Sequence, residues 1–122
     1  MEHALTWFEI PVSEIGRAKR FYQEIFKIEM QDMVVNDHPL ALFPFSGVSG
    51  ALWQEEGYSA PQSGTRIYLT ARENIDVILA RVEAAGGKTI FPRTPVSDEI
   101  GWSAMFQDLD GNRIGLLEEP HE

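Results

Sequence analysis

The sequence predicts an α+β fold made of two consecutive halves, each with one strand, one helix and three further strands. Two segments carry apolar residues at the three- and four-residue spacing of an amphipathic helix. Short runs of β-forming residues flank both segments in the same order, one before the helix and three after it. Residues 55–64 lie between the halves and contain Pro61 and two glycines, which is typical of a linker.

The first half opens with a strand candidate over residues 5–12, which is rich in β-forming residues and is closed by Pro11. Ser13 is a suitable N-cap for the helix that follows. The apolar positions of that helix are Ile15, Ala18, Phe21, Tyr22, Ile25 and Phe26. Three short strands are then predicted, separated by turn residues, at 28–35, 39–45 and 50–54.

The second half repeats this order after the linker. A strand is predicted at 66–70, and Gly86 with Gly87 should end the following helix, as a C-terminal cap requires. The apolar stripe of this helix is Ile75, Ile78, Leu79, Val82 and Ala85. The closing strands are predicted at 88–93, 101–107 and 112–118.

The two halves can be aligned by pattern, although few residues are identical. Segment 7–10 lies sixty residues before segment 67–70, and both are strand candidates followed by a helix. The closing strands of the two halves align when Gly50 is matched with Gly115, which lies more than sixty residues later. A glycine inside a strand weakens it and often marks the close approach of a ligand or of another backbone. We therefore expect these two glycines to make room for a bulky ligand.

Composition excludes several classes of protein. The apolar fraction of 43% is ordinary for a folded domain, and a net charge of −9 argues against nucleic acid or an anionic membrane as a partner. The chain has no cysteine, so it forms no disulfide, thiolate metal site or cysteine nucleophile. No apolar run approaches the roughly 20 residues of a membrane span, and no secretory signal is visible. We expect a cytoplasmic protein.

Several motifs, in this order and spacing, resemble the vicinal oxygen chelate (VOC) superfamily, the glyoxalase/bleomycin resistance protein/dioxygenase-like domain. The match extends from about residue 5 to residue 119. The motifs are Trp7-Phe8-Glu9-Ile10-Pro11-Val12, Arg17-Ala18, Phe21-Tyr22, Ala84-Ala85-Gly86-Gly87-Lys88 and Phe106-Gln107-Asp108-Leu109-Asp110-Gly111-Asn112-Arg113-Ile114.

The resemblance implies one glyoxalase-like domain over residues 1–122, with module one at about 1–57 and module two at about 64–122. Each module is a βαβββ unit, and together the modules form a curved, mostly antiparallel sheet around a cavity. Members of this length are commonly homodimers. Their enzymes hold a divalent metal through one ligand from the first and one from the last strand of each module.

The four positions that the resemblance assigns to metal ligands carry no ligand here. They fall on Trp7, near Gly50, near Ile67 and on Gly115. Indole has no lone pair to offer a metal, and the other three side chains contain no donor atom. We therefore predict no metal and no other cofactor. A divalent metal would need atypical ligands such as Glu9 or His38.

Glu9 lies two residues after Trp7, so both side chains should point to the same side of the strand. Glu9 could act there as a base or hold a cationic ligand; alternatively, it pairs with an arginine such as Arg113 or reaches water. Aromatic side chains could line a pocket for a flat or cationic molecule. The predicted ligand pocket consists of Trp7, Glu9, Phe43, Gly50, Trp53, Tyr68, Trp102 and Gly115.

The leading functional hypothesis is a metal-independent VOC-family protein that binds a small organic molecule, by sequestration or as a sensor. The sequence assigns no catalytic residue. One alternative is a metalloenzyme of the lyase, isomerase or dioxygenase type with atypical ligands. Another is a non-catalytic interaction module whose core is filled by Trp7, Trp53 and Trp102.

Overall fold

The computed structural model describes residue 5 and residues 7–60 and 65–120. The chain divides into two compact units, Met1–Ala60 and Pro61–Glu122. Residues 61–64 of the predicted linker lie outside the described residues. Among the described residues, no helix is both long and apolar enough to cross a membrane.

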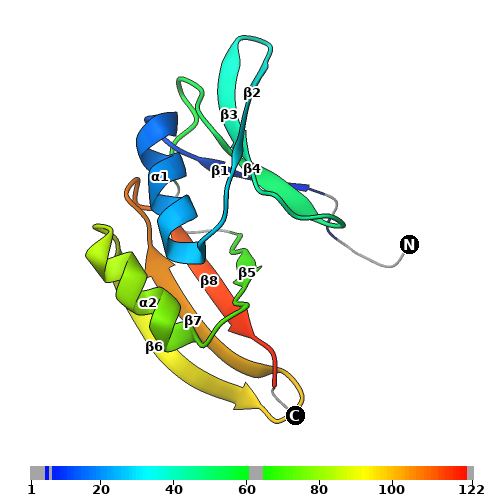
Figure 1. Cartoon of the computed structure of the whole chain (residues 1–122), viewed down its shortest axis with the longest axis vertical. Helices are drawn as coiled ribbons and strands as arrows, with labels where there is room; N and C mark the ends of the chain where they lie inside the picture. The colour runs from blue at the N-terminus through cyan, green and yellow to red at the C-terminus, as the bar shows by residue number, and fades with distance from the viewer. Residues whose placement is uncertain (1–4, 6, 61–64, 121–122) are drawn as a thin grey trace. The chain divides into compact units, whose positions relative to one another are not determined.

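The first unit is one helix with a four-stranded mixed sheet of order β1-β4-β3-β2 (Figure 1). Strand β1 runs parallel to β4, and the other neighbours are antiparallel. The elements are β1 (Trp7–Pro11), α1 (Ile15–Phe26), β2 (Gln31–Val35), β3 (His38–Leu42) and β4 (Ser49–Trp53).

The second unit has the same topology, with strand order β5-β8-β7-β6 and one parallel pair, β5 with β8. Its elements are β5 (Tyr68–Thr70), α2 (Ile75–Ala84), β6 (Lys88–Ser97), β7 (Gly101–Gln107) and β8 (Arg113–Glu118). The predicted α+β fold of two βαβββ modules is confirmed. Gly86 follows α2 with a φ of +97°, as predicted for the residue that ends this helix.

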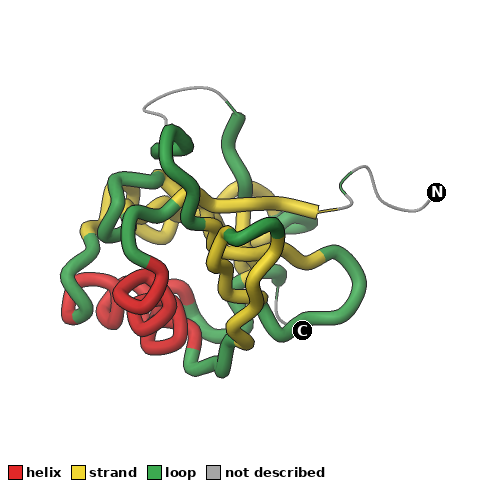
Figure 2. Tube along the Cα trace, turned by 90° about the horizontal axis from the view of Figure 1, so that it is seen from above, coloured by secondary structure: helices red, strands yellow, loops and turns green. Residues whose placement is uncertain are grey.

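In each unit the helix packs against strands of the unit's own sheet. Figure 2 shows the helices in red and the strands in yellow. We call the side of the sheet that contacts the helix the helix face and the opposite side the far face. The core of each unit lies between the helix and the helix face. Its largest fully buried apolar side chains are Ile10, Tyr22, Ile25 and Leu52 in the first unit and Ile75, Ile78, Val82, Phe106 and Leu116 in the second.

The hydrogen-bond register identifies the two faces of the first sheet. Ile10, Leu52, Ala41 and Asp32 are successive register partners across the four strands. Asp32 accepts a hydrogen bond at 3.0 Å from Lys19 on α1, so this row lies on the helix face. Side chains alternate along a strand, and the neighbouring row on the far face is therefore Glu9, Ala51, Leu42 and Gln31.

Register partners identify the two faces of the second sheet in the same way. Ile114 and Phe106 are register partners, both are buried, and Phe106 pairs with Thr89. Glu118, on the same side of β8 as Ile114, accepts from the N–H of Ile75 at the beginning of α2, which places this row on the helix face. The next row, on the far face, is Tyr68, Gly115, Met105 and Phe91, reached on β6 through a bulge between Thr89 and Phe91.

The N-cap of α1 differs from the prediction. Glu14, not Ser13, occupies the cap position, and its carboxylate accepts from the backbone N–H groups of Gly16 and Arg17. The longer acidic side chain reaches two of the N–H groups that the first turn leaves without a helical partner. The Ser13 hydroxyl instead accepts from the Arg17 guanidinium at 3.3 Å.

The residue that ends the sheet in each unit also binds the first N–H of the helix. Gln54 Oε1, directly after β4, accepts from Ile15 N–H at 2.8 Å. Glu118 Oε1, at the end of β8, accepts from Ile75 N–H at 2.8 Å. Glu118 is 1% exposed and forms two further hydrogen bonds with Arg93, at 3.0 and 2.9 Å. This contact joins the beginning of each helix to the end of the same unit's sheet.

The register also corrects the predicted alignment of the halves by one residue. Glu9 pairs with Ala51, and the equivalent pair in the second unit is Tyr68 with Gly115. The position equivalent to Gly115 is therefore Ala51 rather than Gly50. The connection from strand to helix is one residue longer in the second unit, which sequence matching of the helices does not reveal. A one-residue slip transfers a side chain to the opposite face.

Replacing Glu118 by alanine should lower the free energy of unfolding by roughly 3 kcal/mol, because the helix loses its N-terminal acceptor and a buried ion pair is broken. Gln54→Ala, which removes one neutral hydrogen bond in the first unit, should cost only about 1 kcal/mol. Urea unfolding followed by circular dichroism measures both. Glu118→Gln retains an acceptor for Ile75 and should lie between them. Equal losses for the two alanine variants would contradict this account.

Candidate functional site

The far face of the first sheet brings together three of the predicted pocket residues. Trp7 and Glu9 alternate with the helix-face residue Phe8 on β1, and Trp53 is the register partner of Pro11. Register and alternation thus place all three on the same side of the sheet. Trp7 is 45% exposed, so its indole offers an accessible apolar surface beside the Glu9 carboxylate.

Two residues that the sequence did not single out lie next to these side chains. Glu55 Oε1 accepts from Trp53 Nε1 at 2.9 Å and lies 3.8 Å from Nε2 of His38. The Tyr58 hydroxyl donates to the main-chain oxygen of Glu9 at 3.2 Å. Both belong to the segment after β4, which turns back toward β1. Only this tertiary contact identifies them, because the segment reads as a linker in the sequence.

The environment of Tyr58 raises the pKa of its phenol above the usual value near 10. The largest cause is burial, which disfavours the phenolate, and the carboxylates of Glu9 and then Glu55 add to it. Tyr58 therefore lies within the field of both carboxylates, and this end of the far face is electronegative.

Phe43 and Gly50, also predicted pocket residues, lie on the helix face instead. The Phe43 ring packs edge-on against Tyr22 of α1, with ring centroids 5.7 Å apart. Gly50 pairs with Phe8, and a Cβ atom there would lie 2.3 Å from the Phe8 main-chain oxygen and 2.6 Å from its ring. Gly50 thus allows close approach of the protein's own strand.

In the second unit, Tyr68 and Gly115 are adjacent on the far face. A Cβ atom on Gly115 would lie 2.4 Å from the Tyr68 ring. The ring therefore occupies the space into which a side chain at position 115 would project. The expectation that the two glycines make room for a bulky ligand is corrected, because Tyr68 and Phe8 use that room.

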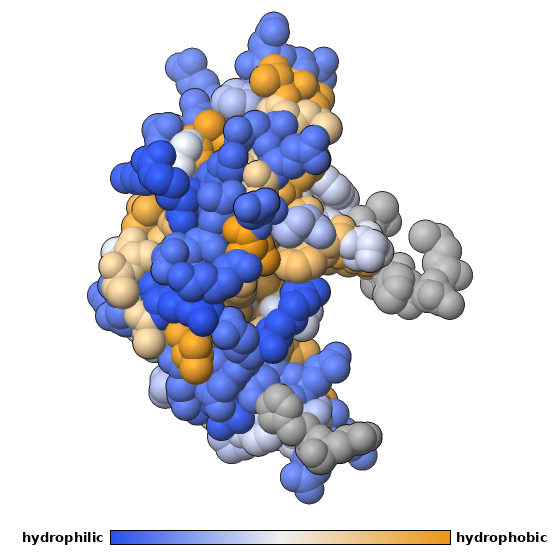
Figure 3. All heavy atoms as spheres, viewed as in Figure 1, coloured by the Kyte–Doolittle hydropathy of each residue, from blue (hydrophilic) through white to orange (hydrophobic). Residues whose placement is uncertain are grey.

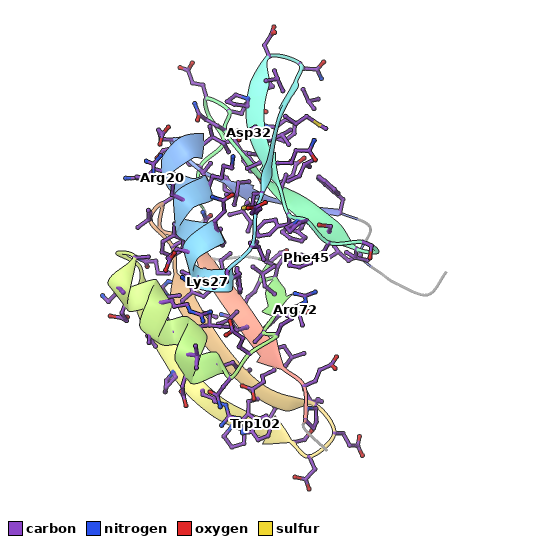
Figure 4. All side chains as sticks on the ribbon, in the orientation of Figure 1. Arg20, Lys27, Asp32, Phe45, Arg72 and Trp102 are labelled. Atoms are coloured by element: carbon purple, nitrogen blue, oxygen red, sulfur yellow. The ribbon has the colours of Figure 1, made fainter. Side chains whose placement is uncertain are left out.

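Trp102 lies on the helix face of the second sheet, in register with Glu118 (labelled in Figure 4). The guanidinium of Arg93 stacks on its ring, 4.1 Å from the centroid, while also bonding Glu118. The hydrogen bond to Glu118 is the main cause that raises the pKa of Arg93. Trp102 is thus part of the network that holds α2, and the structure does not bring it to the far face with Tyr68.

A separate groove of about 440 Å³ lies between α1 and the β2–β3 hairpin. The Lys19–Asp32 ion pair joins its two walls, and Met33 and Val34 add exposed apolar surface. The face seen in Figure 3 is largely hydrophilic, with separate apolar patches in orange. The groove contains none of the predicted pocket residues.

The strand register changes two of the four positions at which the resemblance predicts metal ligands. The four positions assigned to metal ligands by resemblance are Trp7, Ala51, Arg66 and Gly115. Arg66 replaces Ile67, because it is the equivalent of Trp7. None of these side chains has a lone pair for a metal, and the Tyr68 ring covers Gly115. Within residues 5, 7–60 and 65–120 no three His, Asp or Glu side chains form a group that could hold a metal. The residues present do not fit a divalent cation at these positions.

Gly115→Ala should destabilise the second unit by roughly 1–3 kcal/mol, because the new methyl group overlaps the Tyr68 ring. Removing the ring with Tyr68→Ala in the same chain should restore most of the loss. The matched pair is Gly50→Ala with Phe8→Ala, where the overlap with the main-chain oxygen of Phe8 remains and rescue should be partial. Thermal or urea unfolding of the six variants measures the couplings. If the losses of unfolding free energy from Gly115→Ala and Tyr68→Ala simply added in the double variant, the packing of Tyr68 on this glycine would be contradicted.

Tyr58 should titrate at a higher pH than an ordinary tyrosine, and the difference between the tyrosinate absorbance titrations of the wild type and Tyr58→Phe isolates its step. Because the folded-state pKa is raised, the stabilising contribution is complete below pH 10 and is lost as the pH rises through the folded value. Glu9→Gln should lower the pKa only in part, since burial is the larger cause. Glu24→Gln on α1 is the control of equal charge change. If Glu9→Gln and Glu24→Gln changed the pKa of Tyr58 equally, Glu9 would be excluded as a cause of the raised value.

Comparisons with known proteins agree with this topology. A sequence model of the Glyoxalase/Bleomycin resistance protein/Dioxygenase superfamily matches residues 4–116. A glyoxylase-like domain-containing protein of Didymella fabae is 24% identical over 95% of this chain and 94% of its own length.

Two solved structures share the fold. A glyoxalase/bleomycin resistance protein from Albidiferax ferrireducens has a TM-score of 0.75 and 19% identity, covering 97% of this chain and 100% of the other. The fosfomycin resistance protein FosX of Listeria monocytogenes has a TM-score of 0.67 and 18% identity, covering 97% and 94%. With both the family match and the paired βαβββ units in place, the chain belongs to the glyoxalase/bleomycin resistance protein/dioxygenase superfamily.

Proposed function

We propose that this protein binds a small organic molecule without a resident metal and acts by sequestering or sensing it. One observation carries the proposal: the positions that would hold a metal carry Trp7, Ala51, Arg66 and Gly115, and the Tyr68 ring lies over the last of them. Large aromatic and cationic groups at these positions favour recognition of an organic ligand over coordination of a metal.

The far face of the first sheet supplies suitable contacts. Trp7, Trp53 and Tyr58 combine flat apolar surface with polar atoms, which suits a ring system of a ligand. The Glu9 carboxylate would anchor a hydrogen-bond donor or a positively charged group beside the Trp7 indole, where a cation–π contact is also available. The proposed ligand pocket is therefore centred on Glu9.

We propose a cytoplasmic homodimer as the working form.

The alternative is a metalloenzyme of the lyase, isomerase or dioxygenase type. Similar folds include FosX and the glyoxalase I of Zea mays, which has a TM-score of 0.70. A FosX variant is described in complex with Mn(II). For this chain, such an enzyme would have to recruit atypical ligands such as Glu9 or His38. His38 already lies 3.8 Å from Glu55.

Ligand binding should change the fluorescence emission of Trp7 and Trp53 on the far face and leave that of Trp102 unchanged. A panel of flat neutral, cationic and anionic aromatic compounds is titrated against the wild type and against Trp7→Phe, Trp53→Phe and Trp102→Phe. Quenching should be lost with Trp7 or Trp53, which lie on the far face, and retained in the Trp102 variant, which lies on the helix face. A panel that neither quenches emission nor raises the melting temperature would favour the interaction module instead.

The purified protein should contain no stoichiometric nickel, zinc, iron or manganese, and added metal should leave its melting temperature unchanged. Elemental analysis and thermal unfolding with and without a chelator measure this. Glu9→Gln, with Glu24→Gln as a control of equal charge, identifies the ligands if a metal is found. Stoichiometric metal that is lost only in the Glu9 variant would overturn the proposal in favour of the metalloenzyme.

A further inference from the structure

The far face of the second sheet carries a row of cationic side chains. Lys88 pairs with Gln107, and Gln107 pairs with Arg113 on the next strand. The hydrogen bond from Gly115 N–H to the Ile67 oxygen extends the parallel register of β5 beyond its first residue, which places Arg66 beside Arg113. Three cations and one amide thus follow one another across four adjacent strands.

The faces of the neighbouring residues fix the side of the sheet on which this row lies. Ile114 and Phe106, next to Arg113 and Gln107 in sequence, are buried on the helix face. Thr89, next to Lys88, is the register partner of Phe106 and so lies on the helix face as well. Because side chains alternate, Arg113, Gln107 and Lys88 project from the far face, the same side as Tyr68.

Within the part of the chain that the structure describes, these three cations form neither a hydrogen bond nor an ion pair, whereas most other basic side chains do. Lys19, Lys27, Arg81 and Arg93 each pair with a carboxylate. Like charges directly opposite on adjacent strands are destabilising. A row of cations left without carboxylates in a chain of net charge −9 is therefore suited to an anion supplied from outside.

The spacing of the row suits an oxyanion. Neighbouring strands are about 4.8 Å apart, so the two guanidinium groups of Arg66 and Arg113 can approach the same carboxylate or phosphate oxygen atoms. Guanidinium groups bind such oxygen atoms through two parallel hydrogen bonds. The Gln107 amide offers a further donor between Arg113 and Lys88.

The adjacent row on the same face is apolar. It consists of Tyr68, Gly115, Met105 and Phe91, and it lies about 7 Å further along the strands, two residues away. Tyr68 is 49% exposed and Phe91 is 57% exposed, so both rings offer surface to a ligand. Met105 between them is only 3% exposed, and Tyr68 and Phe91 lie on opposite edge strands, so a flat group attached to an oxyanion at Arg66 and Arg113 would lie over Tyr68.

We propose that the far face of the second unit is a subsite for a small molecule that carries a carboxylate or phosphate group on a flat, apolar body. Arg66 and Arg113 on adjacent strands bind the oxyanion, Lys88 on the opposite edge strand adds positive charge, and Tyr68 contacts the ring. This inference rests on the proposed function of small-molecule binding and assigns an acidic group and a flat body to the molecule that the second unit binds.

Isothermal titration calorimetry with three probes of the same ring tests the subsite: 2-naphthoate, 2-naphthylmethylamine and 2-naphthylmethanol. The naphthoate should bind at least tenfold more tightly than the neutral alcohol. Its affinity should fall as the ionic strength rises from roughly 0.1 to 1 M, because the Debye length shrinks from about 10 to 3 Å. 2-Naphthyl phosphate in place of the naphthoate distinguishes the two oxyanions.

Single substitutions identify the residues that bind the oxyanion. Arg113→Gln should weaken naphthoate binding by roughly tenfold or more, since a hydrogen bond to a charged group is lost. Arg113→Lys should recover part of the loss, because it restores the charge without the fork-shaped donor. The matched control is Arg20→Gln on α1, an exposed arginine that likewise forms no ion pair among the described residues and changes the net charge equally. Unfolding curves confirm that each variant is folded.

The outcomes separate this inference from the proposed function. Binding of the amine or the alcohol, with no preference for naphthoate, would overturn the anionic subsite and leave small-molecule binding intact. Equal weakening by Arg113→Gln and Arg20→Gln would assign the preference to net charge and would also overturn the subsite. Failure of every probe, together with the absence of quenching across the fluorescence panel, would overturn both.

Discussion

The hydrogen bond between the end of each sheet and the beginning of each helix is the contact on which the rest of this structure depends. Gln54 supplies it in the first unit and Glu118 in the second, in both cases to the first N–H of the helix. The first N–H groups of a helix have no partner within the helix. By satisfying one of them from the last strand, each unit fixes its helix on one side of its sheet. All other side chains are then divided between a helix face and a far face.

This division explains which aromatic side chains are available to a ligand. Trp7 and Trp53 lie on the far face, whereas Phe43 packs on Tyr22 and Trp102 stacks on Arg93, which itself bonds Glu118. Composition does not distinguish aromatic residues of the far face from those of the helix face. Only the register position of each residue does. The core of each unit uses aromatic surface to hold its helix, so only part of the aromatic content remains for recognition.

The two far faces differ in charge, although the units share one topology. The first carries Glu9 and Glu55, whose carboxylates add to the effect of burial in raising the pKa of Tyr58. The second carries Arg66 and Arg113 beside an apolar row. At the equivalent position, Glu9 in one unit corresponds to Tyr68 in the other. A duplicated fold thus presents an acidic aromatic face in one unit and a basic aromatic face in the other, and the ligand positions of the metalloenzymes are occupied by neither carboxylates nor imidazoles.

The sequence by itself determined the order of elements, the twofold repeat and the family, because hydrophobic periodicity and turn residues act locally. It also determined that Trp7 and Gly115 cannot bind a metal. Tertiary structure alone decided that Ala51 rather than Gly50 matches Gly115, since the register is set by hydrogen bonds between distant strands and a one-residue slip changes the face. The contacts of Tyr58, and the Tyr68 ring over Gly115, likewise join segments far apart in the chain, so no local pattern could reveal them.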